Sequence, residues 1–105
     1  MIRHIVMFKL KEFGSASEKT AAANEVLKRL DELPVAIDLI RRYKAGIDVR
    51  KLNWSYDIVL EMDFDTIADI DAYTIHPVHQ DFIAFNKDYS AAKVCIDFEL
   101  GKVNT

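Results

Sequence analysis

Two of the three histidines in this 105-residue chain lie three residues apart in the segment YTIHPVHQDF, residues 73–82. Tyr73 lies one helical turn before His76, and Pro77 lies between His76 and His79. A neutral imidazole accepts a proton near neutral pH, and a phenol donates a hydrogen bond or orients a substrate oxygen. These residue types favour proton transfer, with His79 and Tyr73 as the candidate catalytic residues.

The position of His79 supports the role of a base. The residue before a proline avoids helical angles, so one helix is expected to end at His76 and the next to begin at Pro77. His79 then lies in the first turn of the second helix, where the positive potential of free N–H groups disfavours a cationic ring. The sequence therefore predicts a neutral His79.

Two histidines are candidate pocket residues. His4 lies in the middle of an apolar strand pattern, and His76 lies at the helix junction. We expect His4, Tyr73 and His79 to converge at one end of a cavity between sheet and helices. Simpler interpretations stay open: a hydrogen-bonded core histidine for His4, a core aromatic for Tyr73 and a helix-end cap for His76.

A metal site is the main competing interpretation, because two histidines three residues apart can share a helical face. Here the proline interrupts that spacing, and no acidic residue occupies the place that a zinc-protease motif requires. Asp71 and Asp81 are only generic further ligands. The chain also has no recognisable phosphate loop, nucleophile elbow or cysteine–histidine pair. We therefore expect neither a metal nor a cofactor.

Composition limits the function classes. The chain has 14 basic and 17 acidic residues and a formal charge of -3, so no global basic field attracts nucleic acid or anionic lipid. The single Cys95 cannot form an intrachain disulfide and no secretory signal is recognised, which favours a reducing, cytoplasmic location. No apolar run approaches the roughly 20 residues of a membrane span. We expect one soluble domain over residues 1–105.

Apolar periodicity predicts the elements that position these residues. Strand patterns cover residues 2–10, 36–49, 54–64 and 92–100. Helical patterns run from a capping Ser15 to Pro34, from a capping Asp65 to His76, and from Pro77 to Tyr89. Residues 101–105 are expected to be frayed. The order strand, helix, strand, strand, helix pair, strand is that of a ferredoxin-like α+β subunit, βαββαβ.

The first strand is apolar on both faces. Its alternating residues form two rows, which are Ile2, His4, Val6, Phe8 and Leu10 on one face and Ile5 and Met7 on the other. The helical segments can cover only one face of the sheet, and a second copy of the sheet is the simplest cover for the other face. We therefore predict a two-fold homodimer.

Five segments give the chain a family resemblance: IRHIVMFKL, the LP that closes the first helix, YDIVLEMDF, AYTIHPVHQDF and the terminal VCIDFEL. They cover nearly the whole chain and resemble the stress-responsive A/B barrel domain family, Dabb, in the dimeric α+β barrel group. The strand-one histidine combined with Tyr-x-x-His-Pro-x-His is the most specific part. The family implies a ferredoxin-like subunit that pairs sheet to sheet with a second subunit into a barrel.

The resemblance also implies roles for residues. Most members have no assigned reaction, but a plant branch works as a polyketide cyclase that closes a poly-β-keto thioester product by aldol condensation without a cofactor. In that branch the tyrosine and last histidine of the motif act together, with the histidine as base, and the strand-one histidine lines the pocket. These positions are Tyr73, His79 and His4 here. The cyclases place another tyrosine in the pocket from the first helix, where this chain has Val26, so the same substrate is not expected.

The sequence as a whole predicts a stress-responsive, Dabb-type homodimer that handles a small hydrophobic carbonyl-type ligand by Tyr/His proton transfer, similar to a polyketide cyclase. Whether it is an enzyme stays open at this point. One alternative is a non-catalytic binding or structural stress protein, whose histidines satisfy buried polar groups. Another is a cofactor-independent monooxygenase of the α+β barrel group, acting on an activated aromatic substrate.

Overall fold

The computed structural model describes residues 1–101, and residues 102–105 of the expected frayed tail lie outside the described part of the chain. The helices and strands follow the predicted order. They are β1 (Ile2–Leu10), α1 (Ala16–Asp31), α2 (Leu33–Ala36), β2 (Arg42–Ile47), β3 (Ile58–Phe64), α3 (Ile67–Thr74), α4 (Pro77–Asn86) and β4 (Ser90–Glu99).

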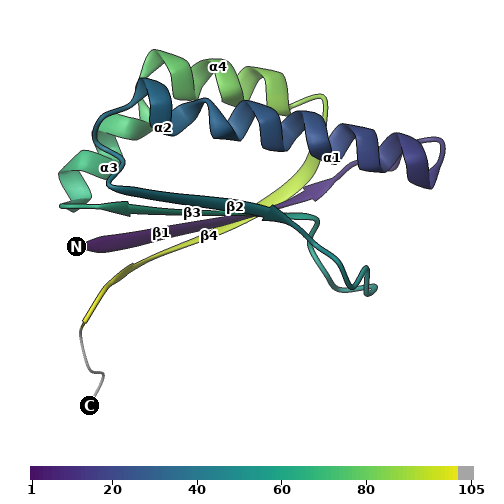
Figure 1. The fold of residues 1–105 in the computed structure, drawn as a ribbon, viewed down its shortest axis with the longest axis horizontal. Helices are drawn as coiled ribbons and strands as arrows, with labels where there is room; N and C mark the ends of the chain where they lie inside the picture. The colour runs from purple at the N-terminus through teal and green to yellow at the C-terminus, as the bar shows by residue number, and fades with distance from the viewer. Residues whose placement is uncertain (102–105) are drawn as a thin grey trace.

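The strands form one four-stranded antiparallel sheet in the order β2-β3-β1-β4. Figure 1 shows the helices gathered over one face of this sheet, and in the described part of the chain no helix lies over the other face. This arrangement is the ferredoxin-like α+β fold that the sequence predicts.

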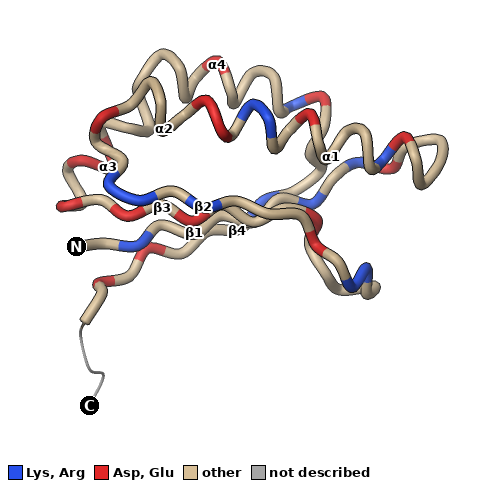
Figure 2. The backbone as a smooth tube through the Cα atoms, viewed as in Figure 1, with Lys and Arg blue, Asp and Glu red and all other residues tan. Residues whose placement is uncertain are grey.

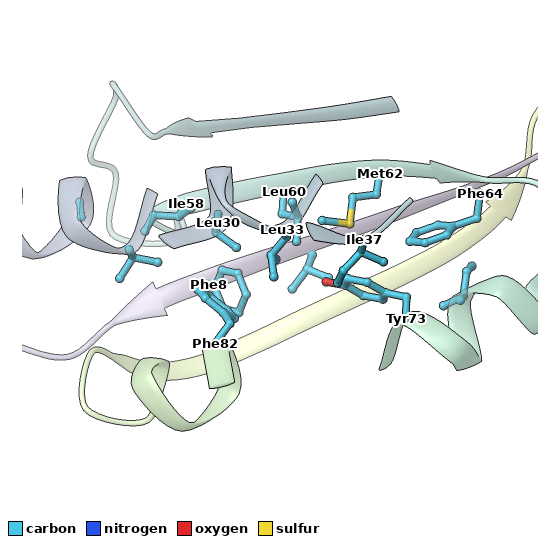
Figure 3. Packing of buried hydrophobic residues seen from close by; sticks show 14 of the residues in the cluster. Phe8, Leu30, Leu33, Ile37, Ile58, Leu60, Met62, Phe64, Tyr73 and Phe82 are labelled. Carbon is cyan, nitrogen blue, oxygen red and sulfur yellow. The ribbon is translucent and has the colours of Figure 1, made fainter. Parts of the chain in front are cut away.

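The core lies between the sheet and the helical layer. β1 contributes Val6, Phe8 and Leu10, because alternate residues of a strand share a face. The ring centres of Phe8 and Phe82 lie 5.9 Å apart, which joins β1 to α4. Figure 3 shows these rings in one cluster with buried residues of α1, β3 and α3. This packing holds α4 over the sheet and so positions the residues at its start.

The structure confirms one predicted helix signal and corrects another. The Ser15 side chain accepts the N–H of Glu18, and the Glu18 carboxylate accepts the N–H of Gly14, so the predicted cap begins α1. α1 ends before Pro34, and Pro34 lies in the first positions of the short helix α2. A proline suits those positions because its missing N–H would have no partner there. Pro34 therefore begins a helix instead of ending one.

Other boundaries differ by a few residues. β2 and β3 are shorter than their apolar patterns, since residues 36–41, 48–49 and 54–57 lie outside the strands. Trp54 is 77% exposed in the loop between these strands, although its spacing suggested a buried strand position. Thr66, not Asp65, caps α3, because its hydroxyl accepts the N–H of Asp69. Apolar spacing alone did not distinguish a strand from the loop that leads into it.

The helix-free face of the sheet carries an apolar patch. Antiparallel register places Ile5 opposite Ile96 and Met7 opposite Val94, so these side chains of β1 and β4 are neighbours. Ile96 is 58% exposed and Val94 is 42% exposed. The second apolar row of the first strand, read from the sequence, therefore continues onto β4 and has no cover within residues 1–101.

A charged cluster adjoins this patch. Arg3 donates from Nε and Nη2 to the two carboxylate oxygens of Asp63, at 2.8 and 3.1 Å. Figure 2 shows acidic and basic segments next to each other along β1, β2 and β3. The hydrogen bond from Arg3 is the main reason why the pKa of Asp63 lies below its ordinary value. The pair ties the start of β1 to the end of β3.

Replacing Asp63 with asparagine is expected to lower the free energy of unfolding at pH 7, because Arg3 loses the nearer of its two carboxylate partners, Asp63 and Glu61. A carboxyl with a lowered folded-state pKa stabilises the fold above its unfolded pKa, about 3.9, and this contribution is lost as the pH falls through the folded pKa. Urea unfolding should therefore separate wild type from Asp63→Asn at pH 7 and bring them together in stronger acid. Exposed Asp38, changed to asparagine, is the control. A difference in unfolding free energy between wild type and Asp63→Asn that is the same at both pH values would contradict the role given to the Arg3–Asp63 ion pair.

Candidate functional site

A cavity of about 540 Å³ lies between α3, α4 and the inner faces of β1 and β4. This volume is in the usual range for small-molecule sites. Apolar side chains such as Phe8, Leu60 and Phe82 line it together with polar ones. The sequence-predicted candidates His4, Tyr73 and His79 all line this one cavity.

The edge strand β4 presents polar side chains to the cavity. Because apolar residues of β4 occupy the outer face, the alternate residues Lys93, Cys95 and Asp97 face the helices. All three remain exposed, since β4 is the last strand of the sheet and the helices do not fully cover it. The cavity is therefore accessible from solvent beside β4.

Tyr73 reaches the cavity from α3. The residue is 2% exposed, and its ring centre lies 4.3 Å from that of His79 and 6.0 Å from that of His4. No residue of 1–101 bonds to its hydroxyl, and no fully buried polar side-chain atom in that range lacks a partner. Tyr73 lines the cavity, and Figure 3 shows its oxygen on the side of the ring that faces Ile37. Burial raises the pKa of this phenol, which stays protonated and can donate.

The break between α3 and α4 orients the ring of His79. The carbonyl of Thr74 lies 2.8 Å from Nδ1 of His79 and accepts a second hydrogen bond from Nε2 of Gln80 at 2.6 Å. Because a carbonyl oxygen only accepts, Nδ1 carries the proton and the neutral ring keeps its free electron pair on Nε2. Nε2 is therefore the atom that can act as a base.

The pKa of His79 is lowered, mainly by burial. The positive charge of Lys93 lowers it further, whereas the hydrogen bond to Thr74 opposes the shift. The predicted neutral ring agrees in direction with this result. The leading cause is burial, which the prediction did not include.

His4 pairs with Asp97, which the sequence interpretation did not single out. The two residues are directly opposite in the β1–β4 register, and Nδ1 of His4 lies 2.5 Å from Oδ1 of Asp97. A carboxylate only accepts, so Nδ1–H donates and Nε2 of a neutral His4 is free. The alternation of β4 was the available signal, because Ile96 and Phe98 on the outer face place Asp97 on the inner one.

His76 lies outside the cavity lining, which corrects the expectation that it is a pocket residue. Its Nδ1 accepts the N–H of Val78 at 3.1 Å, so His76 caps α4 while Pro77 takes the first helical position. α3 ends at Thr74, slightly before the predicted stop at His76. The helix-end interpretation of His76 therefore describes its position.

The structure also bears on the first helix, on metal ligands and on membrane-spanning helices. Val26 is fully buried in the core, and none of the described residues of α1 lines the cavity, so no polar contact comes from the first helix. Among residues 1–101, no three histidine, cysteine or acidic side chains gather as metal ligands. Nor does any helix in that range have the length and apolar character to cross a membrane.

The geometry combines a base with a free Nε2, a protonated phenol beside it and a second histidine held by a carboxylate. The sequence model of the stress responsive A/B barrel domain, Dabb, matches residues 2–100. The chain belongs to the Dabb family. No curated protein matches it.

Solved structures share the fold of this Dabb protein. A dimeric protein of unknown function and ferredoxin-like fold from Bacteroides fragilis is 27% identical, with a TM-score of 0.83 over 94% of this chain and 95% of that chain. A dimeric ferredoxin-like protein of unknown function from Thermobifida fusca is 28% identical, with a TM-score of 0.78 over 94% and 90% of the two chains. The hydroxynitrile lyase of Passiflora edulis is 16% identical, with a TM-score of 0.80 over 99% and 96%, and this likeness shows the fold alone.

Replacing Lys93 with methionine is expected to raise the pKa of His79 in this Dabb protein, because a positive charge that disfavours imidazolium is removed. In the wild type, His79 should titrate below the ordinary histidine value of about 6.5. A histidine-selective NMR pH titration measures the pKa of His79 in the wild type and in Lys93→Met. Lys28 is exposed on α1, so Lys28→Met should titrate like the wild type. An unchanged His79 pKa in Lys93→Met would show that the two groups are not close.

Proposed function

We propose that this Dabb protein catalyses proton transfer at the carbon next to the carbonyl group of a small hydrophobic molecule. The observation that carries the proposal is the pairing of Tyr73 with His79. Their ring centres lie 4.3 Å apart in one cavity, and the Thr74 carbonyl leaves Nε2 of His79 as the basic atom. A base and a hydroxyl donor side by side are the two groups that enolate formation requires.

The proposed step needs no oxidant and no cofactor. Nε2 of His79 removes the proton, the C–H electron pair forms the carbon–carbon double bond of an enolate, and the carbonyl π electrons move onto oxygen. The Tyr73 hydroxyl donates a hydrogen bond to that oxygen and stabilises its charge. The His79 imidazolium then returns its proton to the product. The reaction class is shared with aldol ring closure, but the buried Val26 argues against the substrate of the plant cyclases.

His4 and Asp97 have a supporting role in this proposal. Asp97 accepts the Nδ1 proton of His4 and so holds the ring at the wall of the cavity. A neutral His4 can then accept a hydrogen bond from a substrate hydroxyl through Nε2. Asp97 is a positioning residue, because it acts through His4.

The test of this function measures how fast the hydrogens next to a substrate carbonyl exchange with solvent. In D₂O, the wild type should accelerate exchange of the hydrogens next to the ketone of 4-oxo-4-phenylbutanoate or its amide, measured by proton NMR. His79→Gln should slow this exchange by about 100-fold or more, because the base is lost. Tyr73→Phe should slow it by about 100-fold, because the oxyanion loses a hydrogen-bond donor.

His76→Asn is the matched control for the histidine variant. Asparagine is a good helix cap and His76 does not line the cavity. Its charge is the smallest cause of the lowered His79 pKa, so exchange should change by less than about twofold. Exchange that survives in His79→Gln would remove His79 as the base. If the wild type accelerates exchange of neither compound, the non-catalytic interpretation replaces this one.

We also propose that the protein is a homodimer joined through the helix-free faces of two sheets. The apolar patch around Ile5, Met7, Val94 and Ile96 is the surface that a second copy would cover. Contiguous exposed apolar surface of this kind marks an interaction site. The relatives of known structure from Bacteroides fragilis and Thermobifida fusca are described as dimeric, which supports the same assembly here.

Ile96→Glu is expected to convert the protein to a monomer, because it would bury an unpaired carboxylate at the centre of the interface. Light scattering coupled to size-exclusion chromatography measures the mass. Val35→Glu is the control, since Val35 is 84% exposed on α2, away from the sheet. A monomeric wild type at micromolar concentration would refute the homodimer.

The cytoplasmic location is likewise a proposal. Cys95, the single cysteine of the chain, is exposed on β4. A free, solvent-accessible thiol suits a reducing compartment.

A further inference from the structure

Two positive charges that line the cavity have no partner among the described residues. Lys87 follows α4 directly and Lys93 lies on the inner face of β4, and both line the cavity. Neither ammonium group forms a hydrogen bond or ion pair with any residue from 1 to 101. By contrast, Arg3 and Arg42 on the sheet are both paired with carboxylates. Both lysines are exposed, so each keeps its charge, and cations at the edge of an apolar cavity are suited to an anionic ligand.

The carboxylates of the cavity do not neutralise these lysines. Asp97 is engaged by His4, and the strand register places Asp97 opposite His4 and Lys93 opposite Phe8. Four residues of extended strand put the Cα atoms of Lys93 and Asp97 about 13 Å apart. Asp71 of α3 also lines the cavity and forms no ion pair with either lysine. The lysines and the His4–Asp97 pair therefore define two separate polar regions of one cavity.

Apolar surface connects these regions. Phe8 lies opposite Lys93 across the strands, and the ring of Phe82 lies 5.9 Å from that of Phe8. Lys93, Tyr73 and His79 line the same cavity, and the charge of Lys93 is one of the causes that lower the pKa of His79. A ligand that contacts Lys93 can therefore also reach the Tyr73–His79 pair.

The geometry points to a carboxylate-bearing carbonyl compound as the substrate class: its carboxylate pairs with Lys93, its apolar part lies against Phe8 and Phe82, and its carbonyl lies at Tyr73 and His79. Lys87 adds a second positive charge to the same cavity. The carbonyl part of this inference rests on the proposed function, which it deepens by naming the charge of the substrate. Lys93 is thus assigned as the residue that determines specificity for an acid over its neutral analogue.

The contact between the substrate carboxylate and Lys93 also changes the basicity of His79. A bound carboxylate offsets the charge of Lys93, so the main electrostatic repulsion on a protonated His79 weakens. The base therefore gains proton affinity when the acid is bound, and a neutral ligand does not produce this effect. The His79 pKa is a readout of the Lys93 contact that needs no turnover.

The experiment compares 4-oxo-4-phenylbutanoate with its amide, which differ in charge and hardly in shape. Calorimetric titration at pH 7 should show the acid binding to the wild type at least about tenfold more tightly than the amide. Lys93→Met should remove most of this preference and leave the affinity for the amide within about twofold. Lys93→Arg should retain it, because the charge is kept, and Lys28→Met on the far helix should match the wild type. Added salt should weaken binding of the acid only.

A second readout is the NMR titration of His79, whose pKa should rise when the acid binds and stay constant with the amide. Three results would each overturn the inference. They are equal affinity for acid and amide, no binding of the acid at millimolar concentration, and a preference for the acid that survives in the Lys87→Met/Lys93→Met double variant. Retained binding of the amide shows that the variants are folded. Lysine-dependent acid binding without hydrogen exchange would refute the proposed function but not this specificity. Hydrogen exchange without a preference for the acid would refute this specificity but not the proposed function.

Discussion

Pro77 has no backbone N–H, and the arrangement of the helical layer follows from that missing donor. An uninterrupted helix would require Pro77 to donate to the carbonyl of Tyr73, so the chain breaks and His76 caps the next helix through Val78. Because Val78 is occupied by the cap, the carbonyl of Thr74 has no helical partner. It accepts from His79 and Gln80 instead. One missing donor therefore separates α3 from α4 and also fixes which nitrogen of His79 is basic.

The two faces of β1 and β4 have different proposed roles: one lines the cavity and the other forms the dimer interface. Alternation along β4 places Cys95 and Asp97 toward the cavity and Ile96, between them, toward the helix-free face. The proposed chemistry and the proposed assembly thus occupy opposite sides of the same two strands. A single substitution in β4 affects one of them or the other according to whether its position is odd or even.

Burial and pairing set the charge states of the site in opposite ways. Burial favours the neutral forms of Tyr73 and His79, which suits a donor and a base. Hydrogen bonds from Arg3 instead keep Asp63 ionised on the other face. Lys93 differs from both, because it is charged, lines the cavity and has no partner in the described part of the chain. The cavity is therefore lined largely by apolar side chains and carries the positive charge of Lys93 in the same lining as His79.

The sequence by itself determined the element order, the Ser15 cap and the break at Pro77, because these depend on backbone restrictions and on contacts within one turn. Its alternation and motif also brought His4, Tyr73 and His79 together as candidates. Only the tertiary structure decided that His76 lies outside the cavity lining and that Asp97 and Lys93 belong to it. His4 and Asp97 are 93 residues apart in the chain, and what joins them is the pairing of two strands. Depth of burial and strand register come from contacts between distant segments, which the local spacing of residues does not encode.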